Sequence, residues 1–224
     1  MRALRENGLS ILFGLLFLVT LTGQAAAGFA QYNEELAQHG QDAVTFLSYV
    51  TSSPFVVDVA ENWQSEFLQF FLFIAATIWL IQRGSPESKE PGHAGVQSDR
   101  EQRVGRYADE SSPSGARMRG LVGAVYSNSL LLVMGAVFLL SWWAQSLAGV
   151  VVANAENAEH GEPAMDWLHY IGSPDFWSRT LQNWQSEFLA VGCMIALTIF
   201  LRQRGSSESK PVGAAHDETA VSAE

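Results

Sequence analysis

The sequence contains one cysteine and none of the common catalytic signatures. Cys193 cannot form an intramolecular disulfide, so the fold must depend on packing and hydrogen bonds, and we expect this thiol to be a small buried apolar group. The signatures of phosphate-binding loops, serine hydrolases, zinc proteases and dinucleotide-binding domains are missing from the chain. These absences favour a non-enzymatic protein.

Charge is nearly absent from four stretches, Gly8–Ala30, Phe67–Ile81, Tyr126–Ala153 and Phe188–Leu201. The first and third are long enough to cross a bilayer, which takes about 20 apolar residues. Helices in the cores of soluble proteins rarely run this far without a polar face. We therefore predict an all-α integral membrane protein with four transmembrane helices, at about 8–30, 63–83, 126–152 and 184–204.

Basic residues are few and unevenly placed. The chain has 13 Lys and Arg against 23 Asp and Glu, for a net charge of −10. All the basic residues except Arg179 lie before the first apolar stretch, between the second and third, or after the fourth. The positive-inside rule thus predicts cytoplasmic N- and C-termini and a cytoplasmic central linker. The acidic outward loops disfavour nucleic acid as a partner.

The chain repeats itself at a shift of 121 residues, which places Asn62 on Asn183. The hexapeptide N-W-Q-S-E-F occurs at 62–67 and at 183–188, and Q-R-G-S occurs at 82–85 and 203–206. This pattern predicts two parallel repeats, at 7–90 and 121–211, each with two membrane helices and related by a pseudo-twofold axis along the membrane normal.

The N-terminus also resembles a signal peptide, because Arg2 and Arg5 precede an apolar stretch that ends near Ala25–Ala27. Cleavage would leave three helices. The repeat pairs this stretch with the third one, which is internal and cannot be a signal peptide. We therefore expect the first helix to be retained.

The remaining segments divide by composition. Residues 91–120 are rich in Ser, Gly, Pro and charge, which predicts a flexible cytoplasmic linker, and 212–224 predict a disordered cytoplasmic tail. Residues 43–50 and 164–171 favour short interfacial helices on the outward loops. The pairs Ser53-Pro54 and Ser173-Pro174 are good helix starts, so a helix from Pro54 to Arg83 is expected.

The repeated hexapeptide is the candidate site. Its members in the two copies are Asn62, Trp63 and Glu66, and Asn183, Trp184 and Glu187. The tryptophans are typical of an aromatic belt at the outer interface. If the two glutamate-bearing faces converge, Glu66 and Glu187 would hold a proton or a cation, since carboxylates at a membrane are costly and often functional. Helix packing, or hydrated glutamates at headgroup depth, accounts for the same residues.

Two further symmetric pairs stand out. Gln24 and Gln145 lie in the outer third of their helices, where glutamines commonly form interhelical hydrogen bonds. His39 and His160 each precede a glycine and are weak candidates for a metal or haem ligand. The spacing of zinc ligands is missing around them, and His before Gly is typical of a helix end, here of short turns at 34–39 and 157–160. We predict neither metal nor cofactor.

With N-W-Q-S-E-F and R-Q-R-G-S-x-E-S-K-P established, the chain resembles a family of small bacterial four-helix membrane proteins of unknown function that carry a W-Q-S-E-F signature. The resemblance covers almost the whole chain. It implies a multi-pass protein of the bacterial cytoplasmic (inner) membrane and brings with it no activity, cofactor or catalytic residue.

The function expected is that of a non-enzymatic membrane interaction or envelope module. The alternatives are a small proton or cation channel or transporter that uses Glu66 and Glu187, and a membrane redox or enzyme subunit that uses His39 and His160. The expected partners are the lipid bilayer and either a second copy of the chain or another membrane protein.

Overall fold

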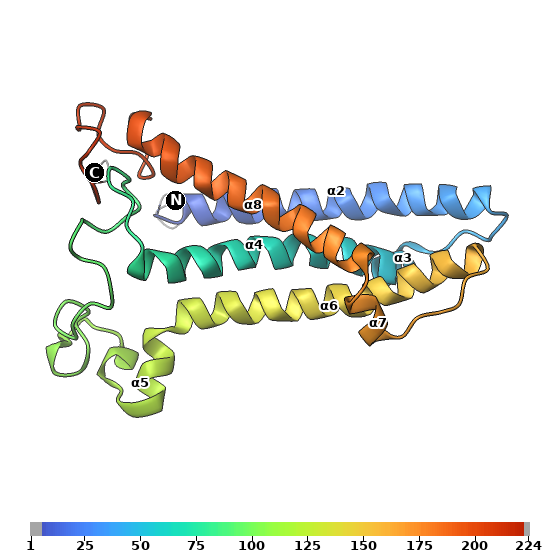
Figure 1. The fold of residues 1–224 in the computed structure, drawn as a ribbon, viewed down its shortest axis with the longest axis horizontal. Helices are drawn as coiled ribbons and strands as arrows, with labels where there is room; N and C mark the ends of the chain where they lie inside the picture. The colour runs from blue at the N-terminus through green and yellow to red at the C-terminus, as the bar shows by residue number, and fades with distance from the viewer. Residues whose placement is uncertain (1–5, 222–224) are drawn as a thin grey trace. The chain divides into compact units, whose positions relative to one another are not determined.

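The computed structural model describes residues 6–221 and is built from helices joined by turns (Figure 1). Helix makes up 66% of it, and the described residues form no strand, which confirms the all-α class. The α-helices are α2 (Gly8–Gln38), α3 (Phe46–Val50), α4 (Ser53–Trp79), α5 (Gly120–Ser127), α6 (Ser129–Glu159), α7 (Trp167–Ile171) and α8 (Pro174–Phe200). Two 3₁₀ helices, η1 (Gly105–Tyr107) and η2 (Ser114–Arg117), lie in the linker.

Two of the helices, α2 and α6, are long and apolar enough to cross a membrane. Each has 31 residues, and their most apolar windows have mean hydropathies of 1.9 and 1.8. Only 6% and 17% of the residues in these windows are buried, so neither helix is the covered core of a soluble domain. Helices α4 and α8 are also long, with 27 residues each.

The helix starts agree with the sequence better than the helix ends do. Helix α4 begins at Ser53 and α8 at Pro174, as predicted. Helix α4 ends at Trp79 rather than near Arg83, because the chain turns there toward Gly84, whose φ is +89°. Helices α2 and α6 continue to Gln38 and Glu159, so the short turns expected at 34–39 and 157–160 belong to the ends of these long helices.

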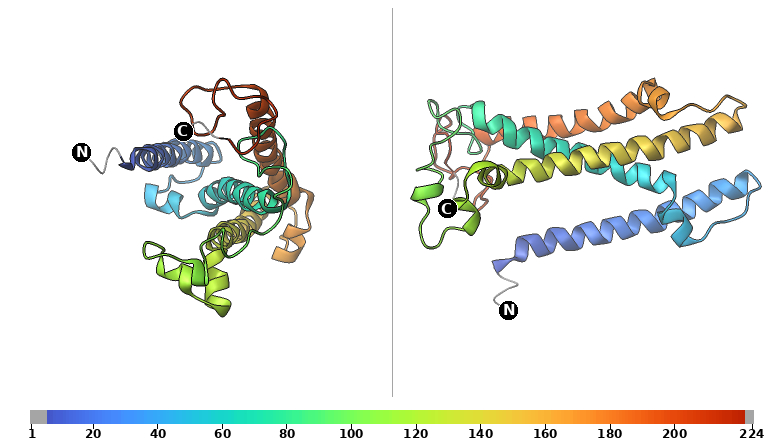
Figure 2. Two further views of the ribbon diagram at one scale, coloured as in Figure 1. Left: turned by 90° about the vertical axis from the view of Figure 1, so that its left-hand side faces the viewer. Right: turned by 90° about the horizontal axis from the view of Figure 1, so that it is seen from below.

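The described residues fall into two compact units. The first, here called the loop unit, comprises the chain up to Ala60 together with Ala144–Ser173. The second, the motif unit, comprises Glu61–Trp143 and the chain from Pro174 onward. Each unit joins segments from both of the repeats expected at 7–90 and 121–211. The residue boundaries between the units fall inside α4 and α6, which Figure 2 draws from two further sides.

Two loops of the loop unit are closed in the same way. Oδ1 of Asn33 accepts from the N–H of Val44 at 2.7 Å, and its Nδ2 donates to the Val44 carbonyl at 3.3 Å. Asn154 makes the same two bonds to Met165, at 2.8 and 2.9 Å. One amide thus satisfies both backbone groups of a residue 11 positions further on, which stabilises each loop.

The short helices expected on these loops are confirmed as α3 and α7. Each begins at a side-chain cap that accepts a backbone hydrogen bond. Thr45 accepts from the N–H of Ser48 at 3.2 Å, and Asp166 accepts from the N–H of His169 at 2.8 Å. Such caps satisfy donors that the first turn of a helix leaves unpaired, which lets five-residue helices form.

A buried tyrosine anchors each short helix. Tyr49 of α3 is 4% exposed and Tyr170 of α7 is 1% exposed. Their hydroxyl oxygens lie against Gly28 of α2 and Gly149 of α6, where a β-carbon would collide with them. These two glycines therefore let each ring reach the helix backbone.

In the motif unit, the chain leaves α4 and α8 through matching turns. Oγ of Ser88 accepts from the N–H of Gln82 at 2.8 Å, and Oγ of Ser209 accepts from the N–H of Gln203 at 2.9 Å. These bonds stabilise the turn and hold the backbone out of the helical path, which ends both helices earlier than their apolar composition indicates.

A lysine closes each of these turns. The ammonium of Lys210 donates to three backbone carbonyls of residues 215–218 at 3.0, 3.0 and 3.1 Å. Burial, with Arg202 adding to it, lowers the pKa of this ammonium. Lys89 donates to the carbonyls of Ile78, in the last turn of α4, at 3.3 Å and Gly95 at 2.7 Å.

The C-terminal segment also bonds to the start of the linker. The N–H of Gly84 donates to Oγ1 of Thr219 at 2.8 Å, and the N–H of Ala220 donates to the carbonyl of Ser85 at 3.1 Å. Residues 212–221 thus form hydrogen-bonded turns, which differs from the disordered tail expected at 212–224, whose last three residues lie outside the described part. The flexibility expected of the linker stays a prediction.

Candidate site at the repeated hexapeptide

Both copies of N-W-Q-S-E-F lie inside helices, at 62–67 in α4 and 183–188 in α8. Matching side chains of the two copies differ in their exposure to solvent. In α4, Gln64, Ser65 and Leu68 are 0%, 2% and 6% exposed. The matching residues of α8 are all exposed: Gln185, Ser186 and Leu189. One copy therefore buries the side of the motif that the other copy leaves open.

A hydrogen bond joins the two copies. Nε1 of Trp184 donates to Oε1 of Gln64 at 2.7 Å, within the motif unit. The amide nitrogen of Gln64 is buried and has no hydrogen-bond partner among the described residues. A fully buried amide needs its carbonyl satisfied, so this bond holds α4 and α8 in a defined register.

Aromatic rings surround this bond. Trp142 of α6 stacks on Phe138 at a centroid distance of 5.7 Å and on Phe176 at 6.0 Å, and it lies 5.8 Å from Trp184. Its own Nε1 donates to Oγ1 of Thr180 at 3.4 Å. Aromatic pairs of this kind contribute about 0.5–1.5 kcal/mol beyond the area they bury. The motif unit is therefore held at this level by α6 and α8 packing through large rings.

The predicted site residues divide according to copy. Asn62, Trp63 and Glu66 are exposed, whereas Asn183, Trp184 and Glu187 are half-buried. The side-chain amide of Asn183 donates to the carbonyl of Arg179 at 3.0 Å, one turn back along α8. The second copy is thus the one whose tryptophan, asparagine and glutamate face protein.

The two glutamates of the motif lie near enough to interact. The negative charge of Glu66 acts on the Glu187 carboxylate, although Glu66 is exposed and it is Gln64 of α4 that bonds to α8.

An ion pair at the start of the motif unit was not expected from the sequence. Nη1 of Arg179 lies 3.2 Å from Oε1 of Glu61, whose side chain is only 14% exposed, and Nε of Arg179 lies 3.4 Å from Asp175. Arg179 is the one basic residue of the predicted outward loops. A single basic residue among so many acidic residues could have predicted an ion pair at Arg179.

The glutamine pair is placed asymmetrically. Gln24 of α2 is exposed, whereas Gln145 of α6 is 0% exposed. A hydrogen bond between them stays a prediction. Cys193, expected to be buried, is exposed on α8, so that expectation is wrong.

The histidines terminate helices. Nδ1 of His39 lies 2.8 Å from the carbonyl of Glu35, and Nδ1 of His160 lies 2.8 Å from the carbonyl of Glu156. Gly40 follows with a φ of +69°. Within residues 6–221 no three His, Cys, Asp or Glu side chains gather as a metal site would require. The geometry is that of helix C-caps and gives the redox alternative no support.

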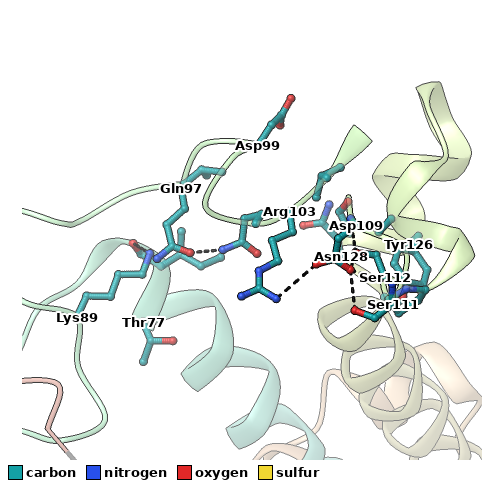
Figure 3. A pocket seen from close by; sticks show the side chains of 18 residues that line it. Thr77, Lys89, Gln97, Asp99, Arg103, Asp109, Ser111, Ser112, Tyr126 and Asn128 are labelled. Atoms are coloured by element: carbon teal, nitrogen blue, oxygen red, sulfur yellow. Dashed lines mark hydrogen bonds and ion pairs between the residues drawn. The ribbon is translucent and has the colours of Figure 1, made fainter. Parts of the chain in front are cut away.

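A hollow of about 860 Å³ lies where α4 ends, among linker residues and the start of α6 (Figure 3). Two of its charged groups already bind one another. Arg103 lies 3.9 Å from Asp109, and the Asp109 carboxylate accepts from the hydroxyls of Ser111 at 2.6 Å and Ser112 at 3.1 Å. These hydrogen bonds lower the pKa of Asp109. The side chains of Arg103 and Asp109 are therefore already engaged with other residues of the linker, and neither is left free to bind a ligand in the hollow.

Sequence reasoning missed several residues that the structure makes central. They are Gln64, the loop-closing Asn33 and Asn154, and the turn-closing Lys89 and Lys210. Each of the five recurs as the same residue type 121 positions away in the chain, and this recurrence could have marked them as important. It identifies positions that matter without saying what each side chain binds.

Comparison with known proteins gives one match. Residues 1–221 match the family described as a domain of unknown function, DUF6766. Neither the curated proteins nor the solved structures provide a match. Since the match covers almost the whole chain, the protein belongs to the DUF6766 family.

Proposed function

We propose that this protein is a membrane-embedded, non-enzymatic interaction module made of two duplicated helical hairpins. In this proposal α2, α4, α6 and α8 each cross the bilayer. The exposure of the apolar surface of α2 and α6 supports it, because water disfavours so large an uncovered apolar surface and lipid does not.

The observation that carries the proposal is the bond from Trp184 to Gln64. It makes the repeated hexapeptide a packing element that ties one repeat to the other. Interhelical hydrogen bonds from glutamine commonly stabilise membrane helix pairs, by about 0.6–2 kcal/mol each. A motif used for packing gives a physical reason for a duplicated chain to keep both copies.

The proposed topology follows the basic residues. Both termini and the linker lie in the cytoplasm of a bacterial cell, and the loops that carry α3 and α7 lie outside the inner membrane. The exposed apolar residues Phe46 and Leu47 of α3, and Trp167 and Leu168 of α7, suit short helices at the lipid surface.

Cysteine accessibility tests this topology. Cys193→Ser removes the native thiol, and single cysteines then replace the exposed residues Gln41, Glu162 and Ser98. A membrane-impermeant maleimide should label positions 41 and 162 in intact spheroplasts, and position 98 only after the membrane is opened. Labelling of position 98 from outside, or protection of either loop position, would contradict the four-helix arrangement.

A second function is favoured by the interacting pair Glu66 and Glu187. Two carboxylates on packed helices could pass protons or cations across the bilayer. The test is ion flux into proteoliposomes, comparing wild type with Glu66→Gln/Glu187→Gln. Flux that disappears in the double variant supports a conduit. A folded wild type without flux removes this candidate and leaves the packing role.

A further inference from the structure

Helix α5 leaves most of its apolar side chains uncovered. Leu121, Val122 and Val125 are 81%, 60% and 50% exposed. Residues three and four positions apart share one side of a helix, so Val125 lies beside both of the others. Tyr126 lies against η2 instead, where a β-carbon at Gly115 would collide with its ring. Packing on η2 therefore holds α5 with an apolar side turned outward.

The chain changes direction at Asn128, between α5 and α6. The side-chain amide of Asn128 donates to the Ala124 carbonyl at 2.8 Å, which ends α5. Its own carbonyl accepts from the N–H of Leu132 at 2.9 Å, which starts α6. Helix α5 consequently runs across the direction of the first turns of α6 (Figure 1). With α6 crossing the bilayer, α5 lies along the membrane surface.

The other side of α5 borders a basic hollow. This hollow, of about 700 Å³, lies between the linker and the small residues of α5, and three arginines line it: Arg100, Arg106 and Arg119. Within residues 6–221 none of the three forms an ion pair with a carboxylate, and Asp99 is the one acidic residue among the lining side chains. Arg106 stacks on Tyr107 and donates to its hydroxyl, which leaves its charge uncompensated.

We propose that α5 and these three arginines bind anionic phospholipid of the cytoplasmic leaflet. The apolar side of α5 enters the boundary between headgroups and acyl chains, and the guanidinium groups bind lipid phosphates. Guanidinium groups pair well with phosphate oxygens, and a helix with one apolar and one basic side is typical of proteins that lie on anionic membranes. The inference rests on the proposed function, because it needs α6 to span the membrane.

Lipid fits this surface better than a soluble anion does. An acidic peptide or a nucleic acid would use the arginines alone and leave the apolar side of α5 in water, whereas a bilayer takes up both. The lipid is also adjacent, since α6 starts at Ser129 and α5 ends at Ser127. Headgroups therefore lie within reach of the arginines.

Fluorescence quenching in nanodiscs that contain phosphatidylglycerol tests the position of α5. On a Cys193→Ser background, the environment-sensitive dye NBD is attached to Leu121→Cys, Leu139→Cys or Glu110→Cys. Leu139 lies in α6 and Glu110 is exposed in the linker, so these sites report lipid and water. A spin label high on the acyl chain should quench the dye at 121, and aqueous iodide should reach it as poorly as the dye at 139.

Two failures of this experiment have different meanings. A dye at 121 that iodide quenches as strongly as the dye at 110 overturns the inference and leaves the arginines to a soluble anionic partner. Iodide that also quenches the dye at 139 shows that α6 does not cross the membrane, so the proposed function fails as well.

Native mass spectrometry tests the class of lipid. Wild type released from nanodiscs of equal phosphatidylglycerol and phosphatidylcholine should retain phosphatidylglycerol in preference. Arg106→Gln/Arg119→Gln should lower this preference about fivefold for each arginine removed, whereas Arg106→Lys/Arg119→Lys keeps the charge and should keep the preference. Both arginines are exposed, so neither variant should change the melting temperature. A wild type without the preference, or a glutamine variant that retains it, overturns the inference.

Discussion

Trp184 donates to Gln64 across 2.7 Å although 120 positions separate the two residues in the chain. Each belongs to an identical hexapeptide, yet Gln64 is fully buried and Gln185 is exposed. Identical local sequence therefore takes two different roles, and the neighbouring helix decides which one each copy takes.

Replacing Trp184 with phenylalanine should destabilise the protein by about 1–2 kcal/mol. The ring remains, but the Gln64 oxygen becomes a buried acceptor without its indole donor. Thermal unfolding in detergent measures the change. Trp177→Phe is the matched control, since Trp177 belongs to the same helix and aromatic cluster. Equal effects of the two substitutions would show that the hydrogen bond is unimportant.

Two glycines of α2 should respond to alanine with opposite signs. At Gly28 a β-carbon would meet the Tyr49 hydroxyl, so Gly28→Ala should destabilise by about 1–3 kcal/mol. At Gly23 the space is open, so Gly23→Ala should stabilise the helix by about 0.5–1 kcal/mol. Melting temperatures of the two variants, measured side by side, check this. A shift in the same direction for both would be inconsistent with the tyrosine anchor.

Asn33→Ala should open the loop that follows α2. Both hydrogen bonds to Val44 are lost, which costs about 1–2 kcal/mol locally. Hydrogen exchange at the Val44 amide should speed up by about 5- to 30-fold, since 1.4 kcal/mol is a factor of ten. Asn33→Asp keeps the 2.7 Å acceptor and should retain most of the protection. Unchanged exchange in the alanine variant would mean that the loop is closed by other contacts.

Glu87→Gln should raise the melting temperature at neutral pH by about 1 °C, a small effect because the group is partly solvated. Burial, and then the charge of Glu208, raises the pKa of Glu87. The folded state thus binds this proton more tightly than the unfolded state, so the wild type loses stability as pH rises through the folded pKa. The advantage of the variant should shrink as the pH falls toward about 4, the ordinary range of glutamate. The exposed Glu110→Gln serves as control, and a pH-independent difference would contradict the assignment.

Much of the fold could be predicted from local patterns. Uncharged stretches identified α2 and α6, and Ser-Pro pairs identified where α4 and α8 begin. The ends of α4 and α8 could not be found this way, because they depend on Ser88 and Ser209 folding back onto the backbone. Apolar composition continues through both ends and therefore carries no stop signal.

The sequence predicted where the candidate site lies, but not which of its side chains are buried or bonded. Repetition identified the hexapeptide, but the emphasis on Trp63 and Glu66 missed Gln64, the residue that the structure buries. A pattern read from one chain treats both copies alike, so it cannot say which glutamine is covered. That difference arises from contact with α8, between residues more than a hundred positions apart.

The bond between Gly84 and Thr219 has a consequence for the order in which the chain matures. A ribosome makes the Gly84 turn 135 residues before the threonine that completes it. During that interval the start of the linker lacks its partner, although α4 is already finished. Assembly of this region is therefore coupled to completion of the second hairpin, so a nascent chain stalled between the repeats would expose an unfinished turn to quality-control proteases.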